Sequence, residues 1–190
     1  MELVTCEELI SVEDYLSGEL VSERKHEYLG GVVHAMAGGK LRHHRAVGNV
    51  FASLFNSLRG KGCQPFNSDT KVRIILPAQT RFYYPDVQVV CESLGDEETF
   101  QDKPVVVVEV LSDSTKRIDL GEKRDAYLAI PSLRVLIIVD PARLWVQVDR
   151  RKVTGGFEQE IYRDLGDLIQ LPEIEGELMV GEIYEGISLA

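Results

Sequence analysis

The chain has 190 residues and a formal net charge of −10; 44% of its residues are hydrophobic and 27% are charged. This composition is typical of a globular protein and argues against one that coats nucleic acid non-specifically, so we predict a single domain over residues 1–190. The apolar runs are too short to span a bilayer and no signal-peptide pattern is present, so we expect a cytoplasmic protein with no membrane partner.

The N-terminal half predicts a helix, a hairpin and a second helix. Thr5 and Glu8 have the spacing of a capping box, so we expect a first helix to begin there and to end near Gly18. Residues 26–29 and 32–37 predict a hairpin, because Gly30 and Gly31 supply the positive φ angles of a tight turn. Over residues 42–58 apolar side chains recur at helical spacing.

The rest of the chain predicts a mixed sheet. We expect strands at residues 63–66, 71–76, 83–90, 105–111 and 133–139, a loop at 95–103 and a helix at 117–129. Residues 144–149 and 157–162 predict a peripheral hairpin, and a short helical turn is expected near 182–184. This order predicts an α/β (α+β) fold with a mixed β-sheet core flanked by helices.

The three cysteines give no sign of a metal site. Cys6, Cys63 and Cys91 are scattered and lack metal-ligand spacing. We therefore expect reduced thiols rather than a disulfide framework.

A carboxylate lies in the most apolar predicted strand. Glu109 belongs to the run 105–111, whose valines predict burial on both faces. A buried ionised carboxylate is costly unless it pairs with a cation or binds a metal. Asp86 lies on the preceding predicted strand, so we interpret the two acids as a divalent-metal site. The structural alternatives are an ion pair for Glu109, and a turn cap or a pair with Arg81 for Asp86.

The helix after this strand offers partners for the two acids. Asp119, Lys123 and Tyr127 are four residues apart and therefore share one helical face. Lys123 could reach back over the strand end, whereas the alternative is an ordinary surface Asp–Lys pair. Glu27 on the first hairpin could add a third carboxylate, although an exposed strand glutamate is the commoner situation.

Basic residues gather where the second helix begins. They could contact phosphate, and they are Lys40, Arg42, His43, His44 and Arg45. The alternative is ordinary solvated charge, as we also expect for an acidic C-terminal tail that begins at Glu158. The sequence has no HExxH, Walker, GxGxxG or GxSxG motif.

With these motifs the chain resembles the Uma-type restriction endonuclease family, a bacterial, notably cyanobacterial, group within the PD-(D/E)XK nuclease superfamily. The resemblance covers residues 20–151 and includes the segments around Glu27, Asp86 and Glu109, the helix 119–127 and the strand 133–140. It implies a restriction endonuclease-like fold and metal-assisted hydrolysis of DNA phosphodiester bonds.

The resemblance also implies roles for individual residues. Asp86, Glu109 and the backbone carbonyl of Val110 would hold Mg²⁺ or Mn²⁺. The superfamily's usual lysine position is Leu111 here, and the lysine of this family is taken to lie on the following helix, at Lys123.

Further residues would support this site. Glu27 would assist metal or water binding, and Asp119 and Tyr127 would fix Lys123. Cutting both DNA strands usually needs two active sites, so we expect a homodimer. The alternatives are a nuclease-fold protein without useful cleavage that binds DNA or another protein, and a hydrolase of a different phosphate ester.

Overall fold

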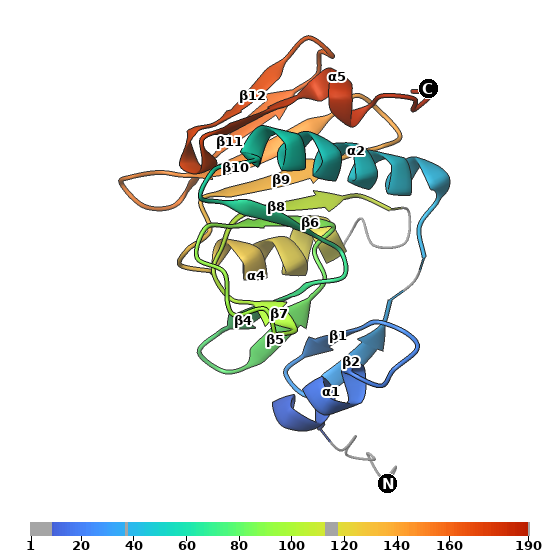
Figure 1. Cartoon of the computed structure of the whole chain (residues 1–190), viewed down its shortest axis with the longest axis vertical. Helices are drawn as coiled ribbons and strands as arrows, with labels where there is room; N and C mark the ends of the chain where they lie inside the picture. The colour runs from blue at the N-terminus through green and yellow to red at the C-terminus, as the bar shows by residue number, and fades with distance from the viewer. Residues whose placement is uncertain (1–8, 37, 113–117, 190) are drawn as a thin grey trace, which may run out of the picture.

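The computed structural model describes residues 9–36, 38–112 and 118–189 (Figure 1). Its strands are β1 (His26–Leu29), β2 (Val32–Ala35), β3 (Gln64–Asn67), β4 (Lys71–Ile75), β5 (Thr80–Tyr83), β6 (Val87–Val90), β7 (Phe100–Gln101), β8 (Pro104–Val110), β9 (Val135–Val139), β10 (Val146–Arg151), β11 (Phe157–Tyr162), β12 (Leu168–Leu171) and β13 (Gly176–Met179). Its helical segments are α1 (Val12–Glu19), α2 (Leu41–Leu58), the π-helix η1 (Asp119–Lys123), α4 (Arg124–Leu128), the 3₁₀ turn η2 (Pro172–Ile174) and α5 (Val180–Ile183).

The strands form two larger mixed sheets and one two-stranded sheet. The six-stranded sheet has the order β11-β10-β9-β8-β6-β3, in which only β8 and β9 run parallel. The five-stranded sheet has the order β2-β1-β5-β4-β7, with β4 and β7 parallel. Strands β12 and β13 pair with each other. The predicted α/β fold with a mixed sheet and flanking helices is confirmed.

Side-chain alternation along β8 separates two hydrophobic cores. Val106, Val108 and Val110 face a core that contains α2, α5 and the β12–β13 hairpin. Val107 and Leu111 face a second core, which contains α4 and parts of β4 and β5. Since successive strand residues point to opposite faces, a polar residue at position 109 must enter the second core.

Helix α2 lies across one face of the six-stranded sheet, and α4 lies on the opposite side of that sheet (Figure 1). The buried positions of α2 are Ala46, Val50, Leu54 and Leu58, which repeat every four residues and form one apolar stripe. The predicted helix over 42–58 is confirmed almost residue for residue.

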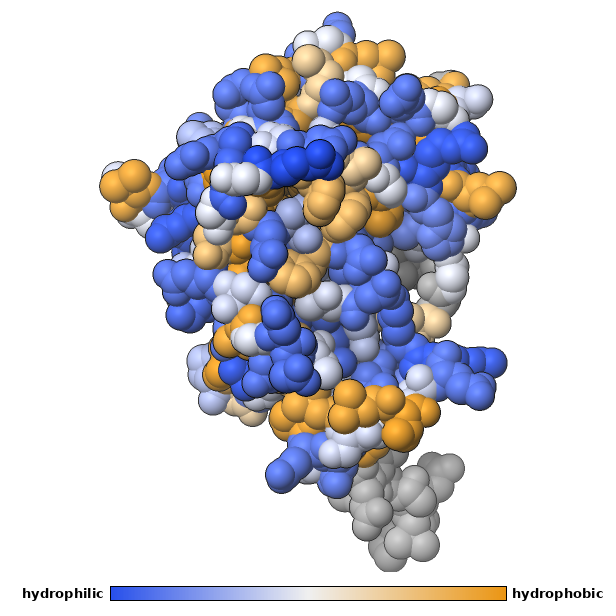
Figure 2. Space-filling view, in the orientation of Figure 1, coloured by the Kyte–Doolittle hydropathy of each residue, from blue (hydrophilic) through white to orange (hydrophobic). Residues whose placement is uncertain are grey.

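The first helix begins later than the capping-box pattern predicted. The N-cap of α1 is Ser11, whose Oγ accepts from the backbone N–H of Asp14. Thr5 and Glu8, which suggested the earlier start, lie outside the described residues. Tyr15 of α1 packs on Tyr28, with ring centroids 5.0 Å apart, and so attaches the helix to the five-stranded sheet. Figure 2 shows apolar surface at this N-terminal end of the molecule, where Leu9, Leu20 and other side chains are exposed.

The predicted strand over 83–90 is two strands in different sheets. Strand β5 ends at Tyr83 and β6 begins at Val87, so the chain crosses from the five-stranded to the six-stranded sheet between them. Pro85 lies in this crossing, and because proline has no N–H it cannot continue a ladder of hydrogen bonds. The crossing places Asp86 at the seam between the two sheets.

The predicted hairpin is confirmed, because β10 and β11 pair at the edge of the six-stranded sheet, with residues 146–149 of β10 buried between β9 and β11. One prediction about the C-terminal part is wrong. The acidic segment is not a solvated tail, since β12, β13 and α5 contribute Ile169, Leu178 and Ile183 to the core under α2. The neighbouring acids Glu177 of β13 and Glu182 of α5 are exposed.

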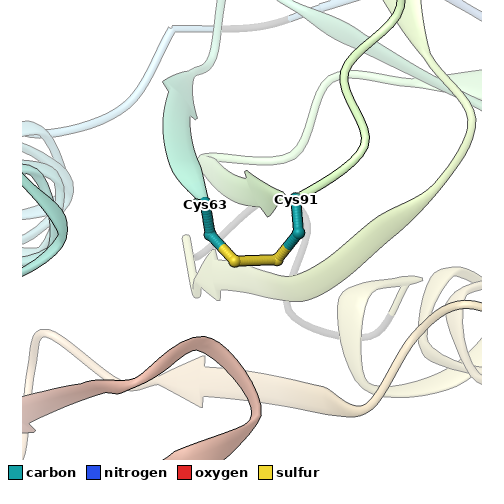
Figure 3. The surroundings of a disulfide bond; sticks show 2 residues. All are labelled: Cys63 and Cys91. Atoms are coloured by element: carbon teal, nitrogen blue, oxygen red, sulfur yellow. A yellow bond between two sulfur atoms is a disulfide. The ribbon is translucent and has the colours of Figure 1, made fainter. Parts of the chain in front are cut away.

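The prediction that all cysteines are reduced is also wrong. Cys63 and Cys91 form a disulfide across the ends of β3 and β6 (Figure 3). Gln64 pairs with Val90 in the antiparallel register, so one further step along each strand brings the two cysteines opposite each other. This pairing depends on strand register and therefore leaves no spacing motif in the sequence.

No helix in the described part of the chain is long and apolar enough to cross a membrane.

Candidate active site

Strand register places the two predicted acids opposite each other. Val87 of β6 pairs with Val108 of β8, so one more antiparallel step sets Asp86 beside Glu109. Both side chains point to the α4 face of the sheet, because their neighbours Val87 and Val108 face α2. The backbone N–H of Val110 donates to Asp86 Oδ2 at 2.7 Å and fixes that carboxylate at the strand end.

Glu109 is buried but has two polar partners. Glu109 is only 4% exposed. The Tyr127 hydroxyl donates to Glu109 Oε1 at 2.6 Å, and Lys123 Nζ lies 3.1 Å from the same oxygen. Burial raises the pKa of Glu109 well above its usual value; Asp86 and Asp119 add to the rise, while Lys123 and Tyr127 oppose it.

Lys123 lies among three carboxylates. Its Nζ is 2.9 Å from Glu27 Oε1, 3.1 Å from Glu109 Oε1 and 4.0 Å from Asp119 Oδ1. Burial lowers the pKa of Lys123, but Glu109, Glu27 and Asp119 together raise it above the usual lysine value. The ammonium group therefore stays charged in a nearly solvent-free position.

The helix that carries Lys123 contains a π-helical segment. Segment η1 covers Asp119–Lys123, and α4 continues directly from it. Asp119, Lys123 and Tyr127 are all buried on the side that faces β8, as the predicted spacing requires. Short π-helical segments in proteins frequently occur at functional sites.

The basic residues at the start of α2 lie in different surroundings in the structure. His43 lies at the acid site, with Nε2 3.4 Å from Asp86 Oδ2. Burial lowers the pKa of His43, but hydrogen bonding and charge from Asp86 outweigh this and raise it above the usual value. His44 contacts the carbonyl of Gly39, and Arg45 donates to the carbonyl of Gly186 in the C-terminal segment. Lys40 and Arg42 line a neighbouring pocket.

A pocket of about 470 Å³ joins these groups. It is lined by the predicted residues Glu27, His43, Asp86, Glu109, Val110, Asp119 and Lys123. The β1–β2 hairpin contributes one wall and the η1 segment another, so the pocket lies where the two larger sheets meet. Tyr127 lies behind Glu109, within the second core.

Some residues of this pocket were not predicted. Glu122 and Tyr83 also line it, and Arg81 pairs with Glu122 at 2.9 Å and donates to the Tyr83 hydroxyl at 3.0 Å. The alternative that Asp86 pairs with Arg81 is therefore wrong. The alternative of an ion pair for Glu109 is correct, since Lys123 is its partner, and this pair lies inside the pocket. Glu122, Tyr83 and Arg81 belong to no recognisable motif in the sequence.

The donors in this pocket are hard oxygen atoms. The pocket is lined by the ammonium group of Lys123 and by five carboxylates. These are Glu27, Asp86, Glu109, Asp119 and Glu122. Within the described ranges, no three His, Cys, Asp or Glu side chains are grouped as a full metal-ligand set. An ion would therefore share Asp86 and Glu109 with backbone or water oxygens, a combination that suits Mg²⁺ and Mn²⁺.

Three comparisons with known proteins give a consistent result. Residues 12–180 match the model of the Uma2 family, which is described as "Putative restriction endonuclease". The uncharacterized protein slr1290 of Synechocystis sp. (strain ATCC 27184 / PCC 6803 / Kazusa) is 33% identical over 182 residues, which are 94% of this chain and 93% of that protein. The crystal structure of "a putative nuclease belonging to DUF820" from Anabaena variabilis ATCC 29413 superposes with a TM-score of 0.72 at 15% identity, over 94% of this chain and 99% of that one, and so shares the fold. The chain therefore belongs to the Uma2 family of restriction endonuclease-like proteins.

Proposed function

We propose that this protein is a divalent-metal-dependent endonuclease that hydrolyses DNA phosphodiester bonds. The observation that carries the proposal is the convergence of Asp86, Glu109 and Lys123, from a sheet crossing, a central strand and a π-helix, on one pocket. Membership of the Uma2 family supports the same reaction class. The proposal assigns DNA as substrate and Mg²⁺ or Mn²⁺ as cofactor.

Asp86 and Glu109 are the residues that would hold the metal. Among the described residues, Asp86 makes its contacts to Val110 and His43 through Oδ2, which leaves Oδ1 as a donor atom. Glu109 Oε1 accepts from Tyr127 and lies 3.1 Å from Lys123 Nζ, so Oε2 remains as its second metal-donor atom. A bound Mg²⁺ or Mn²⁺ would lower the pKa of a coordinated water and stabilise negative charge on the phosphate.

Lys123 supplies a fixed positive charge beside the acids. Its ammonium group has three N–H donors and lies within ion-pair distance of Glu27 and Glu109. An N–H of this group can donate to a phosphate oxygen as charge develops there, in a site with little water to screen it. Glu27 and Asp119 hold the ammonium in place, and Tyr127 keeps Glu109 oriented by its 2.6 Å hydrogen bond.

A plasmid-nicking assay tests the reaction. Purified protein should convert supercoiled plasmid to nicked and linear forms in Mg²⁺ or Mn²⁺, and Glu109→Gln should abolish this with little change in shape. Glu158→Gln, an exposed acid on β11, removes the same charge away from the pocket and should retain activity. Equal nicking by the native protein and Glu109→Gln would identify contamination and favour a nuclease-fold binding module.

Metal binding is tested separately from turnover. Mn²⁺ should raise the melting temperature of the native protein and of Glu158→Gln, because a ligand that binds only the folded state stabilises it. Asp86→Asn should lose this shift. An Mn²⁺ shift of the same size in Asp86→Asn would remove Asp86 from the metal site.

A further inference from the structure

A second pocket adjoins the acid pocket. Its volume is about 440 Å³, and it shares Gly38, Gly39, His43 and Ser112 with the acid pocket, so the two cavities open side by side. Its remaining lining comes from the start of α2, from Leu111 after β8, and from the connection between β9 and β10 at residues 140–143. Lys40, Arg42 and residues 140–143 line only the second of these two pockets.

The second pocket is basic, although the protein as a whole is acidic. Lys40 and Arg42 enter it from the start of α2, and Arg143 enters it from the β9–β10 connection. Asp140 is the one acid among its lining residues, and that carboxylate accepts from Arg143 Nε at 2.8 Å and from the backbone N–H of Ala142 at 3.0 Å. The net positive charge of this lining contrasts with the overall charge of −10 and with the five carboxylates next door.

Arg42 is the most informative residue of this lining. It is partly buried, yet within the described part of the chain it has no hydrogen-bond or ion-pair partner. Comparable partly buried arginines do have partners: Arg124 binds Asp149 through two nitrogens, and Arg150 binds Glu160 and Glu173. A guanidinium with five donors and no acceptor, in a pocket, is suited to a ligand with paired oxygen atoms.

We propose that this second pocket binds the phosphate of the nucleotide next to the one that is cleaved, with Arg42 as its principal ligand and Arg143 at its rim. The inference rests on the proposed function, because it takes the acid pocket as the place of the scissile phosphate. Two adjoining cavities, one rich in carboxylates for metal ions and one rich in cations, match successive phosphates of one strand. The positive pocket thereby offsets the repulsion between an acidic protein and DNA.

DNA binding by Arg42→Gln tests the inference. We would measure the fluorescence anisotropy of a fluorescein-labelled DNA duplex at several NaCl concentrations, with Ca²⁺ in place of Mg²⁺ to measure binding separately from turnover. Loss of one phosphate contact should weaken binding about tenfold at moderate salt and reduce the slope of log K against log salt by about 0.9. Arg42→Lys keeps the charge and should restore the slope.

Arg59→Gln is the matched control. It removes the same charge from the exposed C-cap of α2, about 27 Å along the helix from its start. Native-like Mn²⁺ thermal shifts in all three variants show that fold and acid site are intact. If Arg42→Gln binds DNA with the affinity and slope of Arg59→Gln, or if Arg42→Lys behaves like Arg42→Gln, the inference is wrong.

The same experiments separate this inference from the proposed function. A slope reduced only in Arg42→Gln, together with no nicking by the native protein, supports the phosphate pocket and refutes the endonuclease. Nicking that Glu109→Gln abolishes, together with no effect of Arg42→Gln on binding, supports the endonuclease and refutes the phosphate pocket. Absence of any salt-dependent DNA binding by the native protein refutes the phosphate pocket.

Discussion

Replacement of Lys123 by methionine, which keeps most of its volume, removes the cation that lies among Glu27, Glu109 and Asp119. Its Nζ is 2.9 Å from Glu27 and 3.1 Å from Glu109, and the residue is 6% exposed. At an effective dielectric constant of about 20, each such contact corresponds to about 5 kcal/mol of gross attraction, most of which is offset by desolvation. Removing one partner of a buried pair typically costs about 3–5 kcal/mol, and we expect that loss in the free energy of unfolding at pH 8.

The loss should depend on pH. Burial already raises the pKa of Glu109, and without Lys123, which opposes this rise, the pKa should be higher still. A carboxyl group whose pKa is raised in the folded state stabilises the fold below its unfolded pKa and loses that contribution as the pH rises through its folded pKa. The deficit of Lys123→Met should therefore be smaller at pH 5 than at pH 8.

Urea denaturation followed by circular dichroism measures both effects. The control is Lys152→Met, an exposed lysine after β10, which should change the free energy of unfolding by less than about 0.5 kcal/mol. Mn²⁺ should still stabilise Lys123→Met, because both acids remain, while plasmid nicking should be lost. A deficit below about 1 kcal/mol at pH 8, or a deficit that does not change with pH, would refute the placement of this ammonium among ionised acids.

Three further predictions concern stability and the support of the site. Tyr127→Phe removes the 2.6 Å hydrogen bond to the buried glutamate of β8 and should cost about 1.5–3 kcal/mol in urea denaturation and slow nicking; no change in either would contradict its supporting role. Without reductant, thiol titration of the denatured chain should find one free thiol, and Cys63→Ala with Cys91→Ala should cost about 3.6 kcal/mol by loop entropy for a separation of 28 residues; three free thiols would contradict the disulfide. Arg150→Gln should cost about 1–3 kcal/mol at pH 7. Burial raises the pKa of Glu160, but hydrogen bonds from Arg150 and Tyr162 lower it below the usual value. The stabilisation from the Arg150–Glu160 pair is therefore present above the unfolded pKa of the glutamate, and it should fade as the pH falls toward 3.

Local patterns in the sequence predicted the elements that carry the site. The valine run around Glu109 predicted a buried strand, and the apolar repeat of residues 42–58 predicted α2, because both signals depend on periodicity alone. The spacing from Asp119 to Tyr127 correctly placed both residues and Lys123 on one face, although residues 119–123 are π-helical. Such elements are fixed mainly by their own residues.

Features that depend on long-range register were not predictable in this way. His43 could be seen only as a member of a basic cluster, because its place beside Asp86 requires α2 to pack over β6 and β8. The Cys63–Cys91 pair likewise exists only once β3 has paired with β6. The acidic residues after Glu158 hid the β12–β13 hairpin, since their charge dominates the composition while alternate apolar residues form the core.

The crossing between β5 and β6 lies at the acid pocket, where the two larger sheets meet. One sheet provides Glu27 through β1, the other provides Asp86 and Glu109, and Lys123 touches acids from both. A cation or phosphate bound in this pocket would contact residues of both sheets and would hold the two sheets together. Amide hydrogen exchange should therefore slow throughout β1 and β5 when such a ligand is bound, including at residues that the ligand does not contact.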